Sequence, residues 1–232
     1  MSETATIETL SGEQTFSAYV ARPEGTPRGA IVVIQEIFGV NPGIRRKCDR
    51  LAEAGYLAVA PDLFWRIEPD VELDPDVEAE FQRALGLMGK FDQDQGIRDI
   101  EATIHWIRRS EGVSKVGAVG YCLGGRLAYM TAARTDVDAS VGYYAVGIDN
   151  LLREKHAIAN PLMLHIAGDD GFVDEATQKA MHEGLDGHPK VTLHDYPGLD
   201  HGFATEFGKR RNEQGATLAD ERTAEFFARH LG

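Results

Sequence analysis

The 232-residue sequence has few cysteines, no long apolar run and no excess of positive charge. Its two cysteines, Cys48 and Cys122, are too few for a disulfide framework, which predicts a reduced, cytoplasmic protein. No apolar run approaches the ~18 residues needed to span a bilayer, and the opening residues MSETATIETL lack the regions of a signal peptide. A formal net charge of −13 argues against nucleic acid, whose phosphates need clustered lysine and arginine. We therefore expect neither a nucleic-acid nor a membrane partner.

The sequence also lacks the motifs of metal and nucleotide sites. Histidine, cysteine and acidic residues do not recur at ligand spacings such as C-x₂-C or H-E-x-x-H. There is no G-x-x-x-x-G-K-[ST] loop, and the glycines at 117, 120 and 124 do not match G-x-G-x-x-G. We therefore expect no metal and no cofactor.

Apolar, β-branched runs alternate with helical patterns along the chain. Two weaker segments, near 5–10 and 15–21, are predicted to form a leading antiparallel hairpin. The other predicted strands cover 30–36, 56–61, 115–121, 139–145, 161–167 and 191–196. Alternation of strands and helices is typical of a mostly parallel sheet covered on both faces. We predict a single α/β domain over 1–232, whose ligands bind at the carboxyl ends of the strands.

Capping and spacing predict the helices. Asn41-Pro42 is typical of a helix start, and Ile44, Cys48 and Leu51 then repeat at helical spacing, which favours a buried Cys48. A last helix is predicted at 217–230. The inward side of this last helix carries Phe226 and Phe227. Another buried helix face is marked by Ile97, Ile100, Ile104 and Ile107. Within 66–90, the acidic stretch that opens the segment is predicted to leave the sheet and frame a pocket mouth.

The stretch GAVGYCLGG (117–125) places Cys122 between two glycines, after an apolar run and before an alanine-rich helix. In a G-x-S-x-G elbow the central serine occupies a strained strand-to-helix turn, and Cys122 stands at that position. A thiol of ordinary pKa, ~8.5, is only a few per cent thiolate at neutral pH. A cysteine nucleophile therefore needs a nearby imidazole to take its proton, and the imidazole needs a carboxylate to orient it.

Both partners follow in the order of an α/β-hydrolase triad, nucleophile, acid, histidine. Of the eight histidines, His201 is the one in a glycine-flanked loop just past a predicted strand. The acid comes from GDDGFVD (168–174). Asp170 is favoured because it stands three residues before Val173, and Asp169 is the alternative.

Five segments, QEIFGVN (35–41), APDLF (60–64), GYCLGG (120–125), DGFVDE (170–175) and HGFA (201–204), together resemble the dienelactone hydrolase, or carboxymethylenebutenolidase-like, family. The resemblance covers about 15 to 231. It implies an α/β-hydrolase fold with about eight strands and a hydrolase of small lactones or activated esters that forms a thioester on Cys122. It also implies that Glu36 assists thiol activation. The backbone N–H groups of Leu123 and Ile37 would form the oxyanion hole.

The departures from the family concern the substrate. Thr205 stands where the best-known members have an arginine after H-x-F-A, and a second family arginine is unmatched near Phe81, with Arg83 two residues away. The expected carboxylate clamp is therefore incomplete, because threonine does not replace a bidentate arginine. We expect a small-molecule ester or lactone substrate and a monomer or small homo-oligomer. The candidate substrate contacts are Phe38, Arg83, Met88, Phe203 and Thr205.

An alternative hypothesis makes Cys122 a redox-sensing thiol on a hydrolase scaffold. No C-x-x-C is present, and its one potential disulfide partner, Cys48, is predicted on a buried helix face. A reversible disulfide between the two without esterase activity would favour this alternative.

Overall fold

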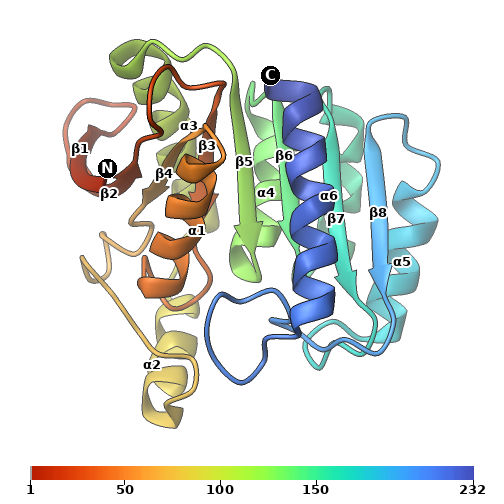
Figure 1. Cartoon of the computed structure of the whole chain (residues 1–232). Helices are drawn as coiled ribbons and strands as arrows, with labels where there is room; N and C mark the ends of the chain where they lie inside the picture. Colours follow the sequence, from red (N-terminus) through yellow and green to blue (C-terminus); the bar gives the residue numbers. More distant parts are fainter. Residues whose placement is uncertain (1) are drawn as a thin grey trace.

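The computed structural model describes residues 2–232 and forms one eight-stranded sheet (Figure 1). Along the sheet the strand order is β1-β2-β4-β3-β5-β6-β7-β8. The β1–β2 and β2–β4 pairs are antiparallel, and every other pair is parallel. The strands are β1 (Ser2–Glu8), β2 (Thr15–Ala21), β3 (Ala30–Ile34), β4 (Leu57–Pro61), β5 (Val116–Tyr121), β6 (Ala139–Tyr143), β7 (Leu162–Ala167) and β8 (Val191–Tyr196). The predicted hairpin and mostly parallel sheet are confirmed, although β1 begins at Ser2 rather than near residue 5.

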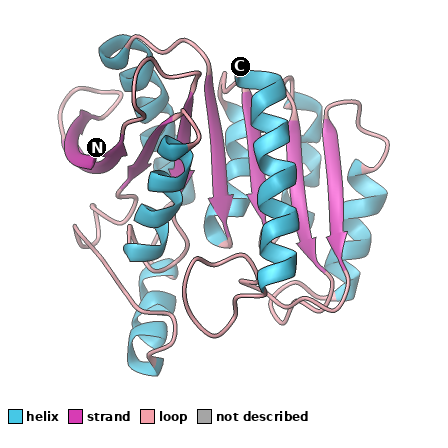
Figure 2. Ribbon diagram, viewed as in Figure 1, coloured by secondary structure: helices cyan, strands magenta, loops and turns pink. Residues whose placement is uncertain are grey.

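Helices cover both faces of the sheet (Figure 2). In the view of Figure 1, α1 (Pro42–Glu53) and α6 (Glu213–Leu231) lie in front of the sheet. Behind it lie α3 (Gln93–Trp106), α4 (Leu123–Arg134) and α5 (Glu175–Leu185). Successive side chains of a strand point to opposite faces, so β3 supplies Ile31 and Val33 to one hydrophobic core and Val32 and Ile34 to the other. All residues of β3 to β7 are buried, as expected for parallel strands covered on both sides.

Two helix boundaries follow from side-chain caps. The Asn41 side chain accepts a hydrogen bond from Ile44 N at 3.1 Å and begins α1, as predicted. Cys48 is fully buried on this helix, which confirms the prediction for it. The last helix begins at Glu213, four residues earlier than predicted, because the Asn212 side chain caps Gly215 N at 2.9 Å. Helix α3 continues into a π-helical turn, Ile107–Glu111, that ends at Gly112 with φ 68°.

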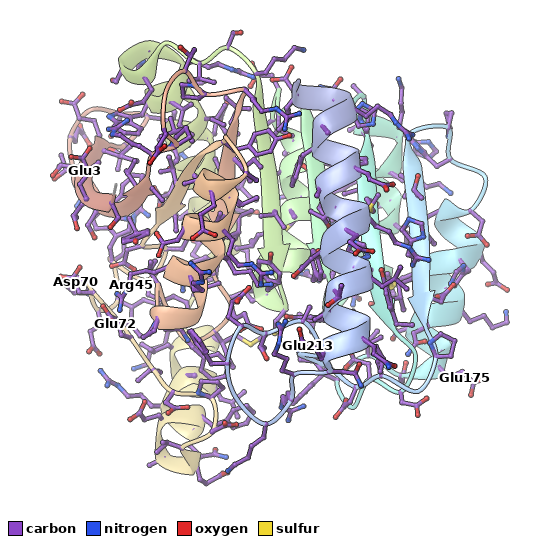
Figure 3. The ribbon with its side chains drawn as sticks, viewed as in Figure 1. Glu3, Arg45, Asp70, Glu72, Glu175 and Glu213 are labelled. Atoms are coloured by element: carbon purple, nitrogen blue, oxygen red, sulfur yellow. The ribbon has the colours of Figure 1, made fainter. Side chains whose placement is uncertain are left out.

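The carboxyl ends of the parallel strands meet at one edge, the lower edge in Figure 1. The segment from 66 to 90 lies beyond this edge and contains α2 (Glu78–Met88). An isolated bridge joins Gly39 to Glu72, and Glu72 also pairs with Arg45 of α1, so the segment is fastened to the body of the fold (Figure 3). A 3-10 helix, Ile148–Ala157, follows β6. No helix within residues 2–232 is both long and apolar enough to cross a membrane.

Candidate active site

Cys122 lies at the sharp turn between β5 and α4. Its φ of 56° and ψ of −114° fall in a region that residues with a side chain seldom occupy. Backbone strain of this kind costs about 1–3 kcal/mol and persists only where the surrounding structure enforces it. Here Cys122 N donates to Tyr143 O at 3.0 Å, and Cys122 O accepts from Arg126 N at 3.2 Å. The turn is therefore held from both sides, with the thiol half-buried at the edge of the sheet.

The two glycines of the elbow are required by close backbone contacts. A Cβ on Gly120 would lie 1.9 Å from Gly124 O, and one on Gly124 would lie 2.4 Å from Ile34 O and 2.5 Å from Gln35 O. No side chain fits at these distances. The first turn of α4 consequently packs directly on the end of β3, and residues 36 and 37, which follow β3, line the same pocket as Cys122.

Gly124→Ala tests this close approach. The new Cβ meets backbone rather than a flexible side chain, so we expect a loss of about 1–3 kcal/mol in the free energy of unfolding and a displaced elbow with little esterase activity. Gly86→Ala is the matched control, because nothing lies within 4 Å of a Cβ there. In the helix interior that change should leave stability equal or raise it by up to about 1 kcal/mol. Equal thermal melts for the two variants would contradict the packing argument.

The structure pairs His201 with Asp170 rather than with Asp169. His201 Nδ1 lies 2.9 Å from Asp170 Oδ2 and 3.1 Å from Oδ1, and both residues are buried. Asp170 Oδ1 also accepts from Phe172 N at 2.8 Å and Val173 N at 3.2 Å, so its carboxylate is fixed by its own loop. Asp169 is exposed and its backbone N–H bonds Leu199 O. Of the two sequence candidates, Asp170 has the geometry of an orienting acid.

Aromatic rings enclose His201 on two sides. The Tyr144 ring centroid lies 4.9 Å from that of the imidazole, and Phe172 lies at the same distance edge-on. Burial tends to lower the pKa of His201, but the negative charge of a Cys122 thiolate and the hydrogen bond to Asp170 outweigh it and raise the pKa. The protonated imidazole is thus favoured beside a thiolate.

Glu36 follows β3 and is buried, with 9 % of its surface exposed. Burial raises its pKa, and the positive charges of His201, Lys47 and Arg210 oppose that rise. Its side chain lines the same pocket as Cys122 and His201. Glu36 and the thiol therefore share one pocket.

The two sequence-predicted oxyanion donors also lie at this point. Leu123 is the first residue of α4, and a helix leaves the first N–H groups without an intrahelical partner. Ile37 lies on the other side of the pocket, in the loop after β3, and lines it. Both residues are buried.

The pocket at Cys122 has a volume of about 80 Å³ and a mainly apolar wall. Three of the predicted substrate contacts, Phe38, Met88 and Thr205, line it. The structure does not bring Arg83 there. Its side chain is half exposed and pairs with Glu68, because it points away from the pocket on α2. Phe203 is fully buried behind the site, packed on Tyr144 and Tyr196, and is a core residue.

Several residues in or next to the pocket were missed from the sequence. Tyr144 follows β6 with φ 36°, a strained conformation next to the site. Arg210 and Lys209 line the pocket mouth, and the Arg210 guanidinium lies 5.6 Å from the Phe172 ring centroid. Tyr144 could have been flagged as the residue at the carboxyl end of a predicted strand. No local signal marks Arg210, since the loop that carries it has no periodicity.

Cys48 is too deeply buried to react with Cys122. Both cysteines are free, and Cys48 is sealed in the core beneath α1, where burial raises its pKa. A disulfide between the two would require α1 to leave the sheet. The redox hypothesis therefore gains no support. Within residues 2–232, no three histidine, cysteine or acidic side chains cluster in a way that could hold a metal ion.

Comparisons with known proteins show the family of the chain. A carboxymethylenebutenolidase of Pseudomonas putida is 38% identical over 229 residues, covering 98% of this chain and 97% of the relative. A provisionally named carboxymethylenebutenolidase of Azospirillum brasilense is 46% identical over 219 residues, 94% of each chain. A crystal structure provisionally assigned as a dienelactone hydrolase, from Klebsiella pneumoniae, superposes with a TM-score of 0.84 at 26% identity over 99% of this chain and 100% of that one. The model of the dienelactone hydrolase family matches residues 16–231. The chain therefore belongs to the dienelactone hydrolase family of α/β-hydrolases and is an ester or lactone hydrolase.

Proposed function

We propose that the protein hydrolyses small lactones and activated esters through a thioester on Cys122, with His201 as proton shuttle and Asp170 as the orienting acid. The observation that carries the proposal is the arrangement of three side chains, those of Cys122, His201 and Asp170. Cys122 and His201 line the same pocket and interact electrostatically, and His201 Nδ1 is bonded to buried Asp170 at 2.9 Å. The strained elbow presents the thiol at the carboxyl edge of the sheet, where such folds bind ligands.

Acylation begins when His201 takes the proton of the Cys122 thiol and the sulfur attacks the substrate carbonyl carbon. The C–S bond forms, and the carbonyl oxygen takes a negative charge that the N–H groups of Leu123 and Ile37 stabilise. The tetrahedral intermediate then collapses, the C–O bond to the alkoxy group breaks, and the His201 imidazolium gives its proton to the leaving oxygen. Asp170 keeps Nδ1 protonated, so the other ring nitrogen faces the reaction.

Deacylation repeats these steps with water. The water oxygen bonds to the thioester carbon while neutral His201 takes its proton, and the C–S bond breaks. The carboxylic acid leaves, and His201 passes the proton on to the sulfur, which restores the resting thiol of Cys122. Glu36 acts on the resting thiol, because a carboxylate beside it opposes formation of a second negative charge.

Trapping of the acyl-enzyme tests the proposal. The protein is mixed with excess p-nitrophenyl acetate, quenched in acid, digested and analysed by mass spectrometry. We expect a burst of one nitrophenolate per active site and an acetyl group on the peptide that contains Cys122. Cys48 is an internal control and should remain unmodified, since it is fully buried. Acetylation of another residue during the burst, with Cys122 unmodified, would refute the assignment.

The cations at the pocket mouth suggest a preference for substrates that carry an acid group. Arg210 makes only long contacts, 3.4 Å to Asp200 Oδ2 and 3.3 Å to His201 O, so its guanidinium has hydrogen-bonding capacity left for a ligand. A charged hydrogen bond at such a half-exposed site is worth about 1.4 kcal/mol, or tenfold in affinity.

Arg210→Gln should therefore raise KM about tenfold for a carboxylated aryl ester and leave KM for its neutral analogue unchanged. Arg83→Gln is the control, because Arg83 pairs with Glu68 outside the pocket and should change neither value. Steady-state kinetics on the matched ester pair measures both. A rise in KM with Arg83→Gln, and none with Arg210→Gln, would reverse the assignment.

A further inference from the structure

A second cavity adjoins the active-site pocket. Its volume is about 380 Å³, compared with about 80 Å³ for the pocket at Cys122. Glu36 stands in the wall between them, as does Thr205. The full set of residues that line both spaces is Glu36, Pro75, Asp76, Thr205, Phe207 and Gly208. The cavity thus begins directly behind Glu36, which shares a pocket with the thiol.

The second cavity is lined by buried polar atoms whose hydrogen-bonding capacity is not filled. Four buried side-chain atoms within residues 2–232 lack a hydrogen bond: Tyr144 Oη, Thr205 Oγ1, Lys47 Nζ and Ser140 Oγ. The first three belong to residues that line this cavity, and Ser140 does not line it. Lys47 Nζ pairs ionically with Glu206 at 3.3 Å, and the Tyr144 hydroxyl interacts with the Glu36 carboxylate, so Thr205 Oγ1 is the hydroxyl of this set that has neither kind of partner within residues 2–232. Tyr144 is only 1 % exposed and Lys47 only 7 %. Buried polar atoms are almost always hydrogen-bonded, to protein or to ordered water, so this cavity is built to hold water.

The pocket at Cys122 is a poor route for water once a lactone has reacted. A lactone's leaving oxygen stays tethered to the acyl group, so the ring-opened chain remains in the pocket while the thioester waits. The wall of that pocket is apolar, with Phe38, Leu85 and Met88 among its residues, and its free volume is small. The attacking water must then come from the other side of Glu36.

The negative charge of the cavity lining favours the entry of water over the entry of a carboxylate product. Six acidic residues line it, with Lys47 as the single basic one: Glu36, Glu72, Asp74, Asp76, Glu80 and Glu206. A carboxylate product is repelled from such a space, whereas neutral water enters freely. The mouth of the pocket instead carries Lys209 and Arg210, which favour an anion.

We propose that the second cavity supplies the water that hydrolyses the thioester, and that Thr205 and Tyr144 are positioning residues that hold this water for His201. The inference rests on the proposed thioester mechanism. In the step, the water oxygen bonds to the acyl carbon, the C–Sγ bond to Cys122 breaks, and the water proton passes to His201 and then to the sulfur. The Tyr144 ring contacts the imidazole, at 4.9 Å between centroids, and its hydroxyl interacts with the Glu36 carboxylate in the wall between the two spaces.

The test uses Thr205→Val, which keeps the shape and removes the hydroxyl, with dihydrocoumarin as the lactone and p-nitrophenyl acetate as the open ester. Slower deacylation lowers kcat and KM together and leaves kcat/KM unchanged, because kcat/KM reports the steps up to acylation. We expect both constants for the lactone to fall about tenfold, and intact-mass spectra to show accumulated acyl-enzyme. With p-nitrophenyl acetate the leaving group departs and opens the mouth to water, so the fall should be no more than about threefold.

Three further variants keep the result interpretable. Thr205→Ser retains the hydroxyl and should restore the wild-type constants. Tyr144→Phe should resemble Thr205→Val and serves if that variant folds poorly. Ser140→Ala removes the one unpartnered hydroxyl remote from the cavity and should leave both constants unchanged.

Two results would overturn the proposal. One is a fall in kcat/KM that is equal for lactone and ester, which would mark Thr205 as merely structural. The other is unchanged lactone turnover in both Thr205→Val and Tyr144→Phe. In both cases wild-type protein still forms its thioester, so the proposed function survives. Absence of any thioester on Cys122 in the wild type would remove the proposed function and this inference together.

Discussion

Cys122→Ala abolishes ester hydrolysis, with kcat/KM lower by about 10⁵-fold or more, since members of a nucleophilic triad act as a unit. The fold should persist. Alanine keeps the Cβ of the strained turn, and the contacts of Cys122 N with Tyr143 O and of Cys122 O with Arg126 N are made by backbone atoms. Stopped-flow kinetics with p-nitrophenyl acetate and thermal melts measure the two effects.

Two control variants distinguish the loss of the nucleophile from an effect on stability. Cys48→Ala removes the other thiol from the core and should retain activity at a cost of about 1 kcal/mol in stability. Cys122→Gly should be as inactive as Cys122→Ala, yet equally or more stable, because glycine occupies φ 56° without strain. Turnover by Cys122→Ala within tenfold of wild type would refute the nucleophile assignment.

Asp170→Asn is expected to lower kcat about 10³–10⁴-fold, because an amide no longer holds the required tautomer of the histidine. The carboxylate also helps raise the pKa of His201. Its removal lowers that pKa, so the imidazolium loses its proton at lower pH and the basic limb of the pH–rate profile moves to lower pH. The profile of kcat/KM between pH 5 and pH 10 measures the shift.

Asp169→Asn is the matched control, one residue away. Its side chain is exposed, and its recorded bond is made by its backbone N–H. We expect activity within about twofold of wild type, since exposed substitutions of this kind are usually near neutral. A larger loss for Asp169→Asn than for Asp170→Asn would exchange the two roles.

Much of the fold could be predicted because its causes are local. Strands that are buried on both faces read as continuous apolar runs, and each of β3 to β8 lies within one or two residues of its predicted bounds. The start of the last helix, which a single side chain sets, was predicted less accurately. The last helix begins at Glu213 because Asn212 caps it, a cue that hydrophobic periodicity does not contain.

The candidate site was predictable where motif and topology coincide. Cys122 directly follows β5, and His201 lies in the loop that follows β8. The carboxyl ends of these strands meet at one edge, so chain order predicts that the two residues approach each other. The choice between Asp170 and Asp169 was harder, since both lie in the same loop. Burial and a 2.9 Å contact to His201 Nδ1 separate them.

By itself, the sequence determined the elements and their alternation, and it named the candidate thiol, imidazole and acid, because these depend on side-chain type and on spacing along the chain. Only the tertiary structure decided which cation lines the pocket, that Arg83 turns away from it, and that a polar cavity lies behind Glu36. The physical reason is distance along the chain. The walls of both spaces combine segments near 36, 75 and 205, and their contacts form only when the loops at one sheet edge pack together.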